Sequence, residues 1–189
     1  EYAELVSYGG GKDVFFGGRT ASERYDELIR RHADEYGLDW RLIKRQMLAE
    51  SEGRPQAVSS QGARGLMQFM PSAWREWGQG NPHDPEASIR AGVAYMSFLM
   101  GKFEEIPDEL ERYKFALASY NAGRHNINQC LEYARQATGA PGNYQDWVDA
   151  GEPTGPWQEW RVASQFLHMA TGRFANTTIQ YVQQIMGEE

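Results

Sequence analysis

Apolar residues recur every three or four positions through most of the chain, which is the period of an amphipathic α-helix. Sustained alternation of apolar and polar residues, the pattern of a half-buried strand, does not occur. We therefore predict an all-α fold of short helices joined by long loops. The predicted helices begin near Thr20, Asp39, Pro71, Asp84 and Asp108, and further helices cover residues 124–138, 157–170 and 177–186.

The predicted helix starts carry residues that satisfy free backbone N–H groups. Thr20 and Glu23 form a capping box. Asp39 is a favourable N-cap for the second helix, and Asp108 with Glu111 caps a later one. These caps agree with the boundaries that the apolar period indicates.

Three stretches interrupt the helical pattern. Residues 1–20 are rich in Gly and predict an N-terminal arm, followed by one domain over 21–189. Residues 53–70 hold too many Gly and Ser for a regular element, so we expect a structured loop there. Residues 139–156, rich in Gly, Pro and Asp, predict a second loop.

Composition narrows the class of protein. A net charge of −7 argues against a nucleic-acid partner, which needs a basic face. No transmembrane segment or signal peptide is visible, but the chain begins with Glu1, so a processed or trimmed product stays open. The single cysteine, Cys130, excludes an intramolecular disulfide. The scattered histidines lack the spacing of metal ligands, so we expect no metal and no cofactor.

Glu50 is the candidate general acid. It follows Ile43 and Met47 at helical spacing, so it continues the apolar face of its helix, where loss of water raises the pKa of a carboxyl group. Gly53 and Pro55 end the helix just beyond, and the negative end of the helix dipole raises the pKa further. A carboxyl that keeps its proton near neutral pH suits acid catalysis. The alternative is a helix-end glutamate that bends out to water.

The loop after Glu50 adds groups that fit a polar ligand. Gly62 and Gly65 let the backbone approach a ligand closely. The Gln68 amide can donate and accept hydrogen bonds, and the Ser59 hydroxyl can do the same. Each of these residues, taken alone, also fits an ordinary turn.

Several blocks follow one another along the chain. They are Glu50-Ser51, Ala57-x-Ser59, Gly62-Ala63-x-Gly65-Leu66-Met67-Gln68-x-Met70-Pro71, Ser119-Tyr120-Asn121-Ala122-Gly123 and Thr178-x-x-Tyr181-Val182. Together they resemble the soluble lytic transglycosylase domain of glycoside hydrolase family 23, over roughly residues 21–186. The helix starts at 39–43 and 84–89 resemble, within that family, the membrane-bound lytic murein transglycosylases of type F.

The resemblance implies a lysozyme-like helical fold and cleavage of the β-1,4 bond between N-acetylmuramic acid and N-acetylglucosamine in peptidoglycan. It implies that Glu50 alone serves as acid and then base. Glu50 protonates the glycosidic oxygen and then takes the proton of the muramic C6 hydroxyl as that hydroxyl attacks C1. The product is a 1,6-anhydromuramic end, no water is consumed, and the scheme departs from the usual pair of carboxyl groups.

The resemblance also assigns substrate contacts. It implies that Ser59 contacts the N-acetyl group beside the cleaved bond, and that Gln68 and Met70 line the groove around the same sugar. Tyr120 resembles a tyrosine beside the catalytic acid, and Tyr181 resembles a later groove tyrosine. Core packing with a satisfied hydroxyl is the alternative for both tyrosines.

Aromatic residues in the second half of the chain suit a sugar ligand, because flat rings stack on pyranose faces. We expect Trp147, Trp157 and Trp160, within the segment 143–160, to form one wall of the groove. Arg64 lies in the loop after Glu50, and we expect its guanidinium to be solvated.

Other functions stay open. A goose-type hydrolytic lysozyme would need a second carboxyl group ~6.5–9.5 Å from Glu50 to position water. Asp146, Asp149 and Glu159 are candidates, whereas Glu52 cannot share a helix face with Glu50. A non-catalytic peptidoglycan-binding module of a phage or secretion machine is the second alternative. The chain is also compatible with one module of a longer enzyme, whose regulatory or anchoring domain lies outside it. We expect it to face the cell envelope, in the periplasm or on a virion.

Overall fold

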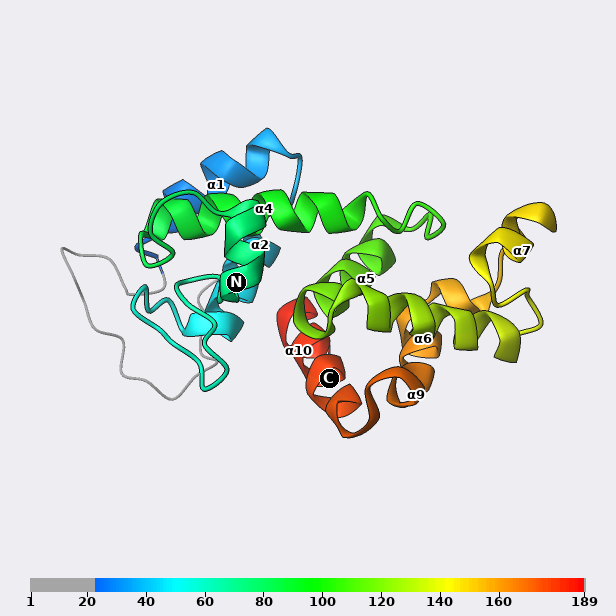
Figure 1. Cartoon of the computed structure of the whole chain (residues 1–189). Helices are drawn as coiled ribbons and strands as arrows, with labels where there is room; N and C mark the ends of the chain where they lie inside the picture. Colours follow the sequence, from blue (N-terminus) through cyan, green and yellow to red (C-terminus); the bar gives the residue numbers. More distant parts are fainter. Residues whose placement is uncertain (1–22, 189) are drawn as a thin grey trace. The chain divides into compact units, whose positions relative to one another are not determined.

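The computed structural model describes residues 23–188 of the chain (Figure 1). The predicted N-terminal arm over 1–20 and the cap at Thr20 lie outside the described residues. The chain divides into two compact units, and the boundary between them follows Tyr95. The separation of an arm from one catalytic domain over 21–189 stays a prediction.

The described part of the chain is helical, which confirms the predicted all-α fold. No strand occurs among residues 23–188, where isolated bridges join Arg64 to Val58 and to Phe69. In chain order the helical elements are α1 (Asp26–Glu35), α2 (Trp40–Ser51), α3 (Pro71–Trp77), α4 (Pro85–Met100), α5 (Glu109–Ala122), α6 (Arg124–Ala137), α7 (Tyr144–Asp149), η2 (Pro156–Gln158), α8 (Trp160–Ala163), η3 (Ser164–Phe166), α9 (Leu167–Thr171), η4 (Gly172–Phe174) and α10 (Ala175–Met186).

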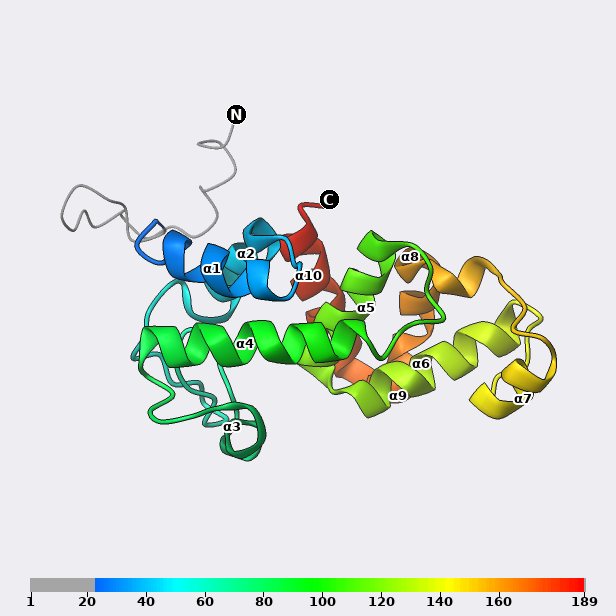
Figure 2. The same ribbon diagram turned by 90° about the horizontal axis from the view of Figure 1, so that it is seen from above.

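In the first unit, α1 and α2 lie side by side (Figures 1 and 2). Ile43 of α2 is fully buried, and the Lys44 ammonium forms an ion pair with the Asp26 carboxylate of α1 at 2.8 Å. Asp39 caps α2 as predicted, because its carboxylate accepts a hydrogen bond from the backbone N–H of Arg41 at 2.9 Å. These contacts fix the helix that carries the candidate acid.

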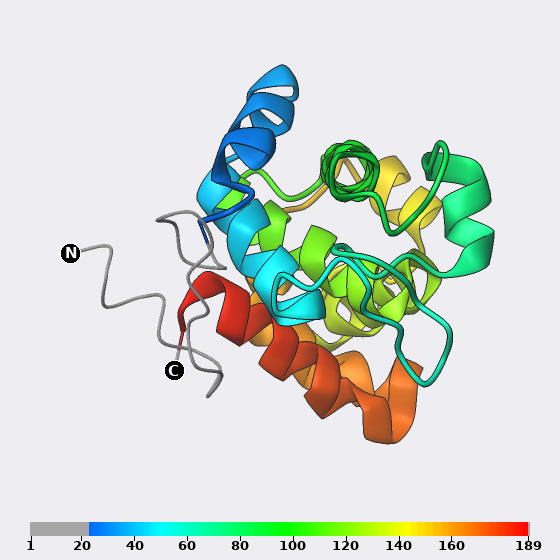
Figure 3. The same cartoon turned by 90° about the vertical axis from the view of Figure 1, so that its left-hand side faces the viewer.

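The loop over 53–70 leaves the end of α2 (Figure 3) and is structured, as predicted. It is tied to α4 by the buried Ser88 hydroxyl, which accepts a hydrogen bond from the backbone N–H of Met67 at 3.1 Å. The start of α4 was also predicted, since the Asp84 carboxylate accepts from the backbone N–H of Ala87 at 2.8 Å. The loop is therefore held at a helix end as well as by its own turns.

In the second unit, α5 packs against α6 and α10, and α6 packs against α9 (Figures 1 and 2). Asp108 caps α5 as predicted, accepting from the backbone N–H of Glu111 at 2.8 Å. The Glu111 side chain is used elsewhere, accepting from the Lys114 ammonium at 2.8 Å and from the backbone N–H of Trp160 at 2.6 Å. A carboxylate of α5 thus holds the start of α8.

The second unit differs from the prediction at two places. Helical residues cover most of 157–170, as predicted, but they are divided among η2, α8, η3 and α9, and the break between η2 and α8 lies at Glu159, which is extended with φ −89° and ψ 127°. The loop predicted over 139–156 contains α7. This short helix is capped by Asn143, whose side-chain oxygen accepts from the backbone N–H of Gln145 at 2.9 Å.

Candidate functional site

Glu50 lies in the last turn of α2 and is half-buried. The helix closes at Glu52, whose backbone is left-handed with φ 54°, and Gly53 follows with φ 71°. The predicted stop just beyond Glu50 is confirmed, although Glu52 and not a glycine makes the first left-handed turn. Glu50 therefore sits at the carbonyl end of a helix, as the sequence indicated. The raised pKa of Glu50 stays a prediction.

A cavity of about 460 Å³ lies beside Glu50 in the first unit. Its volume falls within the range of small-ligand sites. Among the described residues that line it, only Glu50 carries a carboxyl group. The structure thus brings three of the predicted site residues to one cavity, whose lining residues are Glu50, Arg54, Gln56, Ala57, Val58, Ser59 and Gln68.

Backbone hydrogen bonds hold the loop that forms this cavity. The N–H of Gly65 donates to the carbonyl oxygen of Ala57 at 3.0 Å, and the N–H of Ser59 donates to that of Ala63 at 2.9 Å. Gly65 has φ +80°, and a Cβ atom there would lie 2.0 Å from the carbonyl oxygen of Pro82. Only glycine adopts this positive φ readily and also leaves room for the carbonyl oxygen of Pro82. The close approach predicted for Gly65 is therefore to the protein's own backbone.

The side chains of Ser59 and Gln68 are fixed by this loop. The Ser59 hydroxyl accepts a hydrogen bond from the backbone N–H of Ala63 at 3.0 Å, and its own O–H can still donate. The Gln68 amide nitrogen donates to the carbonyl oxygens of Gly65 at 2.9 Å and Ala57 at 3.3 Å. Both of its hydrogens serve the turn, so the amide oxygen is the group that Gln68 can offer to a ligand.

The remaining predicted contact in the first unit is Met70. Its side chain is 42% exposed, and the residue directly precedes α3. Met70 is not among the described residues that line the cavity beside Glu50. Its proposed contact with a sugar stays a prediction.

Tyr120 and Tyr181 belong to the second unit. Tyr120 is half-buried in the last turn of α5, and Tyr181 is buried on α10. Their two sequence blocks meet, because the hydroxyl of Thr178 donates to the side-chain oxygen of Asn121 at 2.7 Å. The role of Tyr120 beside the catalytic acid and that of Tyr181 in the groove stay predictions.

The aromatic wall predicted from the tryptophans is wrong. Trp147, Trp157 and Trp160 are 4%, 0% and 3% exposed, so their faces cannot stack on a sugar. Trp157 packs edge-to-face on Trp147 with ring centroids 5.7 Å apart, and Trp160 packs in the same way on Phe115 at 5.3 Å. These rings belong to the core of the second unit.

The carboxylates considered for a hydrolytic reaction are exposed residues of the second unit: Asp146, Asp149 and Glu159. Asp149 accepts a hydrogen bond from the side-chain nitrogen of Gln145 at 2.9 Å, and Glu159 pairs with Arg161 at 3.2 Å. The assignment of one of them as a base that positions water stays a hypothesis.

Arg54 and Gln56 are lining residues that the sequence analysis missed. The Nε of Arg54 donates to the carbonyl oxygen of Ser51 at 3.2 Å, which turns the side chain back along the end of α2. Arg64, the cation considered from the sequence, is not among the described lining residues. Arg54 could have been found from its position in the sequence, because it directly follows Gly53, at the predicted end of the helix that carries Glu50.

The described residues offer no metal site and no membrane-spanning helix. Within residues 23–188, no group of three or more His, Cys, Asp or Glu side chains is arranged to hold a metal ion. None of the helices described there has the length and apolar character needed to cross a membrane. Cys130 is buried, its thiol donates to the carbonyl oxygen of Ala163 at 3.1 Å, and burial raises its pKa to about 12.

Comparison with known proteins shows the family to which the chain belongs. A family model described as the transglycosylase SLT domain matches residues 27–141. A curated relative from Marinobacter nauticus, named membrane-bound lytic murein transglycosylase F, is 33% identical over 87% of this chain and 33% of the relative. The relative of that name from Yersinia pestis is 38% identical over 66% of this chain and 25% of the relative. The chain thus spans about a third or less of these relatives.

Solved structures share the fold. The 70 kDa soluble lytic transglycosylase SLT70 from Escherichia coli matches 88% of this chain and 25% of its own, with a TM-score of 0.56 and 19% identity. An inactive mutant of the lytic transglycosylase Slt from Pseudomonas aeruginosa matches 86% of this chain and 25% of its own, with a TM-score of 0.52 and 23% identity. The predicted lysozyme-like helical fold is thereby confirmed.

Proposed function

Because the chain belongs to the transglycosylase SLT domain family, we propose that it is a peptidoglycan lytic transglycosylase. It cleaves the β-1,4 bond between N-acetylmuramic acid and N-acetylglucosamine without water and leaves a 1,6-anhydromuramic end. The observation that carries the proposal is the position of Glu50. It is the one carboxyl group among the described residues that line its cavity, at the end of a capped helix.

A single carboxyl group suffices for this reaction if it acts twice. Glu50 first gives its proton to the glycosidic oxygen as the bond to C1 breaks. The resulting carboxylate then takes the proton of the muramic C6 hydroxyl, whose oxygen bonds to C1 and closes the anhydro ring. Glu50 gives up one proton and takes up one proton, so it is again an acid when the next cycle begins.

The other cavity residues support binding of a sugar that carries an N-acetyl group. The Ser59 O–H and the Gln68 amide oxygen are a donor and an acceptor fixed by the same loop. An acetamido group presents the complementary acceptor and donor. We assign Met70, Tyr120 and Tyr181 to the same glycan groove on the family resemblance alone.

The partner in this proposal is the glycan strand of peptidoglycan, and the place is the cell envelope. Support comes from the curated relatives, whose name describes membrane-bound enzymes that act on murein. Those relatives are more than twice as long as this chain, which supports a regulatory or anchoring domain outside it.

The decisive experiment is mass spectrometry of soluble fragments after digestion of purified peptidoglycan. We expect 1,6-anhydromuramic ends, each lighter by one water than a hydrolytic product. Glu50→Gln should bind glycan and fold normally but lose nearly all turnover. Glu52→Gln is the matched control, because Glu52 is an exposed carboxylate two residues away that does not line the cavity.

Each alternative has its own result. Reducing ends would identify a goose-type hydrolytic lysozyme and refute the proposed reaction. Glycan binding without soluble fragments would identify a binding module. Cleavage by Glu50→Gln at the parental rate would refute the assignment of the acid.

A further inference from the structure

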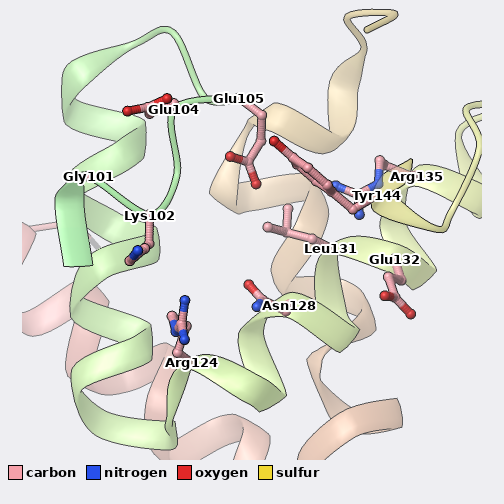
Figure 4. Close-up of a pocket in the computed structure, with 10 residues that line it drawn as sticks. All are labelled: Gly101, Lys102, Glu104, Glu105, Arg124, Asn128, Leu131, Glu132, Arg135 and Tyr144. Atoms are coloured by element: carbon pink, nitrogen blue, oxygen red, sulfur yellow. The ribbon is translucent and has the colours of Figure 1, made fainter. Parts of the chain in front are cut away.

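The second unit contains a cavity of about 360 Å³ that the proposed reaction does not use. It lies between the turn that follows α4, one face of α6 and the start of α7 (Figure 4). Six of its ten lining residues are charged. A cavity of this size fits the lower end of the range for small-molecule sites.

Three of the lining residues are cations. The Lys102 ammonium and the Arg124 guanidinium both lie over the ring of Phe98, at 4.8 and 5.9 Å from its centroid. Arg135 is only 3% exposed and donates two hydrogen bonds to the carbonyl oxygen of Gly142, at 3.0 and 2.9 Å. Burial lowers the pKa of Arg135 somewhat, but a guanidinium keeps its charge in a protein.

Three carboxylates line the same cavity: Glu104, Glu105 and Glu132. Among the ion pairs within residues 23–188, none includes any of these carboxylates or any of the three cations. Burial raises the pKa of Glu105, which the nearby charge of Arg135 opposes. Six charged groups therefore surround one space, and none forms an ion pair with another, although Arg135 interacts electrostatically with Glu105 and Glu132.

Figure 4 shows Lys102 and Arg124 on one side of the cavity, with Glu104 above them, and Glu105 farther across, near the ring of Tyr144. Arg135 also lies beside Tyr144, but its guanidinium donates to the carbonyl oxygen of Gly142. Tyr144 is 55% exposed, so its ring is open to a ligand at the mouth, and the apolar side chain of Leu131 lies between the two sides. A ligand that complements this lining carries a negative group at one end, a positive group at the other and little charge between.

We propose that this cavity binds a short zwitterionic peptide, with its carboxylate toward Lys102 and Arg124 and its ammonium toward Glu105. A neutral ligand would remove water from these charged groups without offering them an opposite charge, and such desolvation is unfavourable. A zwitterion pairs each end with charge-assisted hydrogen bonds, the strong kind. A metal ion does not fit, since these carboxylates form no metal-binding group within residues 23–188.

The test uses the whole chain and trialanine, whose charges lie only at its free ends. Isothermal titration calorimetry should detect binding of trialanine and no binding of its N-acetylated, C-amidated form. Lys102→Gln and Arg124→Gln should each weaken the affinity about 3–10-fold, as expected for partly exposed charged contacts. Glu105→Gln should weaken it through loss of the ammonium partner.

Arg173→Gln is the matched control, because it removes an exposed cation of the second unit that packs on Phe174 and does not line the cavity. Its affinity for trialanine should equal that of the parent. Equal binding of free and capped trialanine, or no binding of either, would overturn the proposal. Displacement of trialanine by a trimer of N-acetylglucosamine would overturn it in favour of a sugar site. The inference does not involve Glu50, so peptide binding and glycan cleavage can fail separately.

Discussion

The substitution Gly65→Ala probes how tightly the loop beside Glu50 is built. Gly65 has φ +80°, so an alanine there costs about 1–2 kcal/mol in backbone strain alone. Its Cβ would also lie 2.0 Å from the carbonyl oxygen of Pro82 and 3.1 Å from the hydroxyl of Ser88. Backbone must move to relieve the first contact, which adds about 1–3 kcal/mol by analogy with overpacked cores.

Gly62→Ala separates the two costs. Gly62 has φ +91°, but nothing lies within 4 Å of a Cβ added there. Gly62→Ala should therefore lose stability through backbone strain alone, without a steric clash. The difference in melting temperature between the two variants should be roughly 2–12 °C, since 1 kcal/mol corresponds to ~2–4 °C in a protein of this size.

Thermal unfolding followed by circular dichroism measures this difference, and release of soluble fragments from peptidoglycan measures the consequence for the site. We expect Gly65→Ala to lose more activity than Gly62→Ala at a temperature where both are folded. The reason is that the Gly65 N–H holds the carbonyl oxygen of Ala57, in the loop that carries Ser59. Equal melting temperatures for the two variants would refute the steric argument.

Two further predictions concern buried groups of the second unit. Burial raises the pKa of the Cys130 thiol to about 12, so its reaction with a disulfide reagent near pH 8 should be roughly 10³-fold slower in the native protein than after unfolding, because the thiolate is the reactive form. Fast labelling of the folded protein would contradict this. Burial also raises the pKa of Glu105 above its ordinary 4.5, so the native state holds the proton more tightly and stability falls as pH rises from 4.5 through the folded-state pKa. Glu105→Gln removes this loss, so its melting temperature relative to the parent should be higher at neutral pH than at about pH 4; a difference independent of pH would contradict the assignment.

Local signals in the sequence determined the start and end of several elements. Asp39 and Asp108 each cap a helix whose first N–H groups lie two or three residues away, and such bonds depend on the local chain alone. The same local rules placed Glu50 at the end of α2, ahead of a structured loop. The family resemblance rested on that loop, so the candidate acid, Ser59 and Gln68 could be named from the sequence.

Only the tertiary structure decided which way the aromatic rings point and where the C-terminal helices break. Trp147 and Trp157 belong to the core because they pack on each other, which their spacing in the chain does not reveal. The start of α8 depends on the carboxylate of Glu111, 49 residues before Trp160 in the chain. The charged cavity bounded by α6 and α7 likewise combines residues from separate segments. Such contacts arise from packing between distant parts of the chain, whereas periodicity and capping act within a few residues.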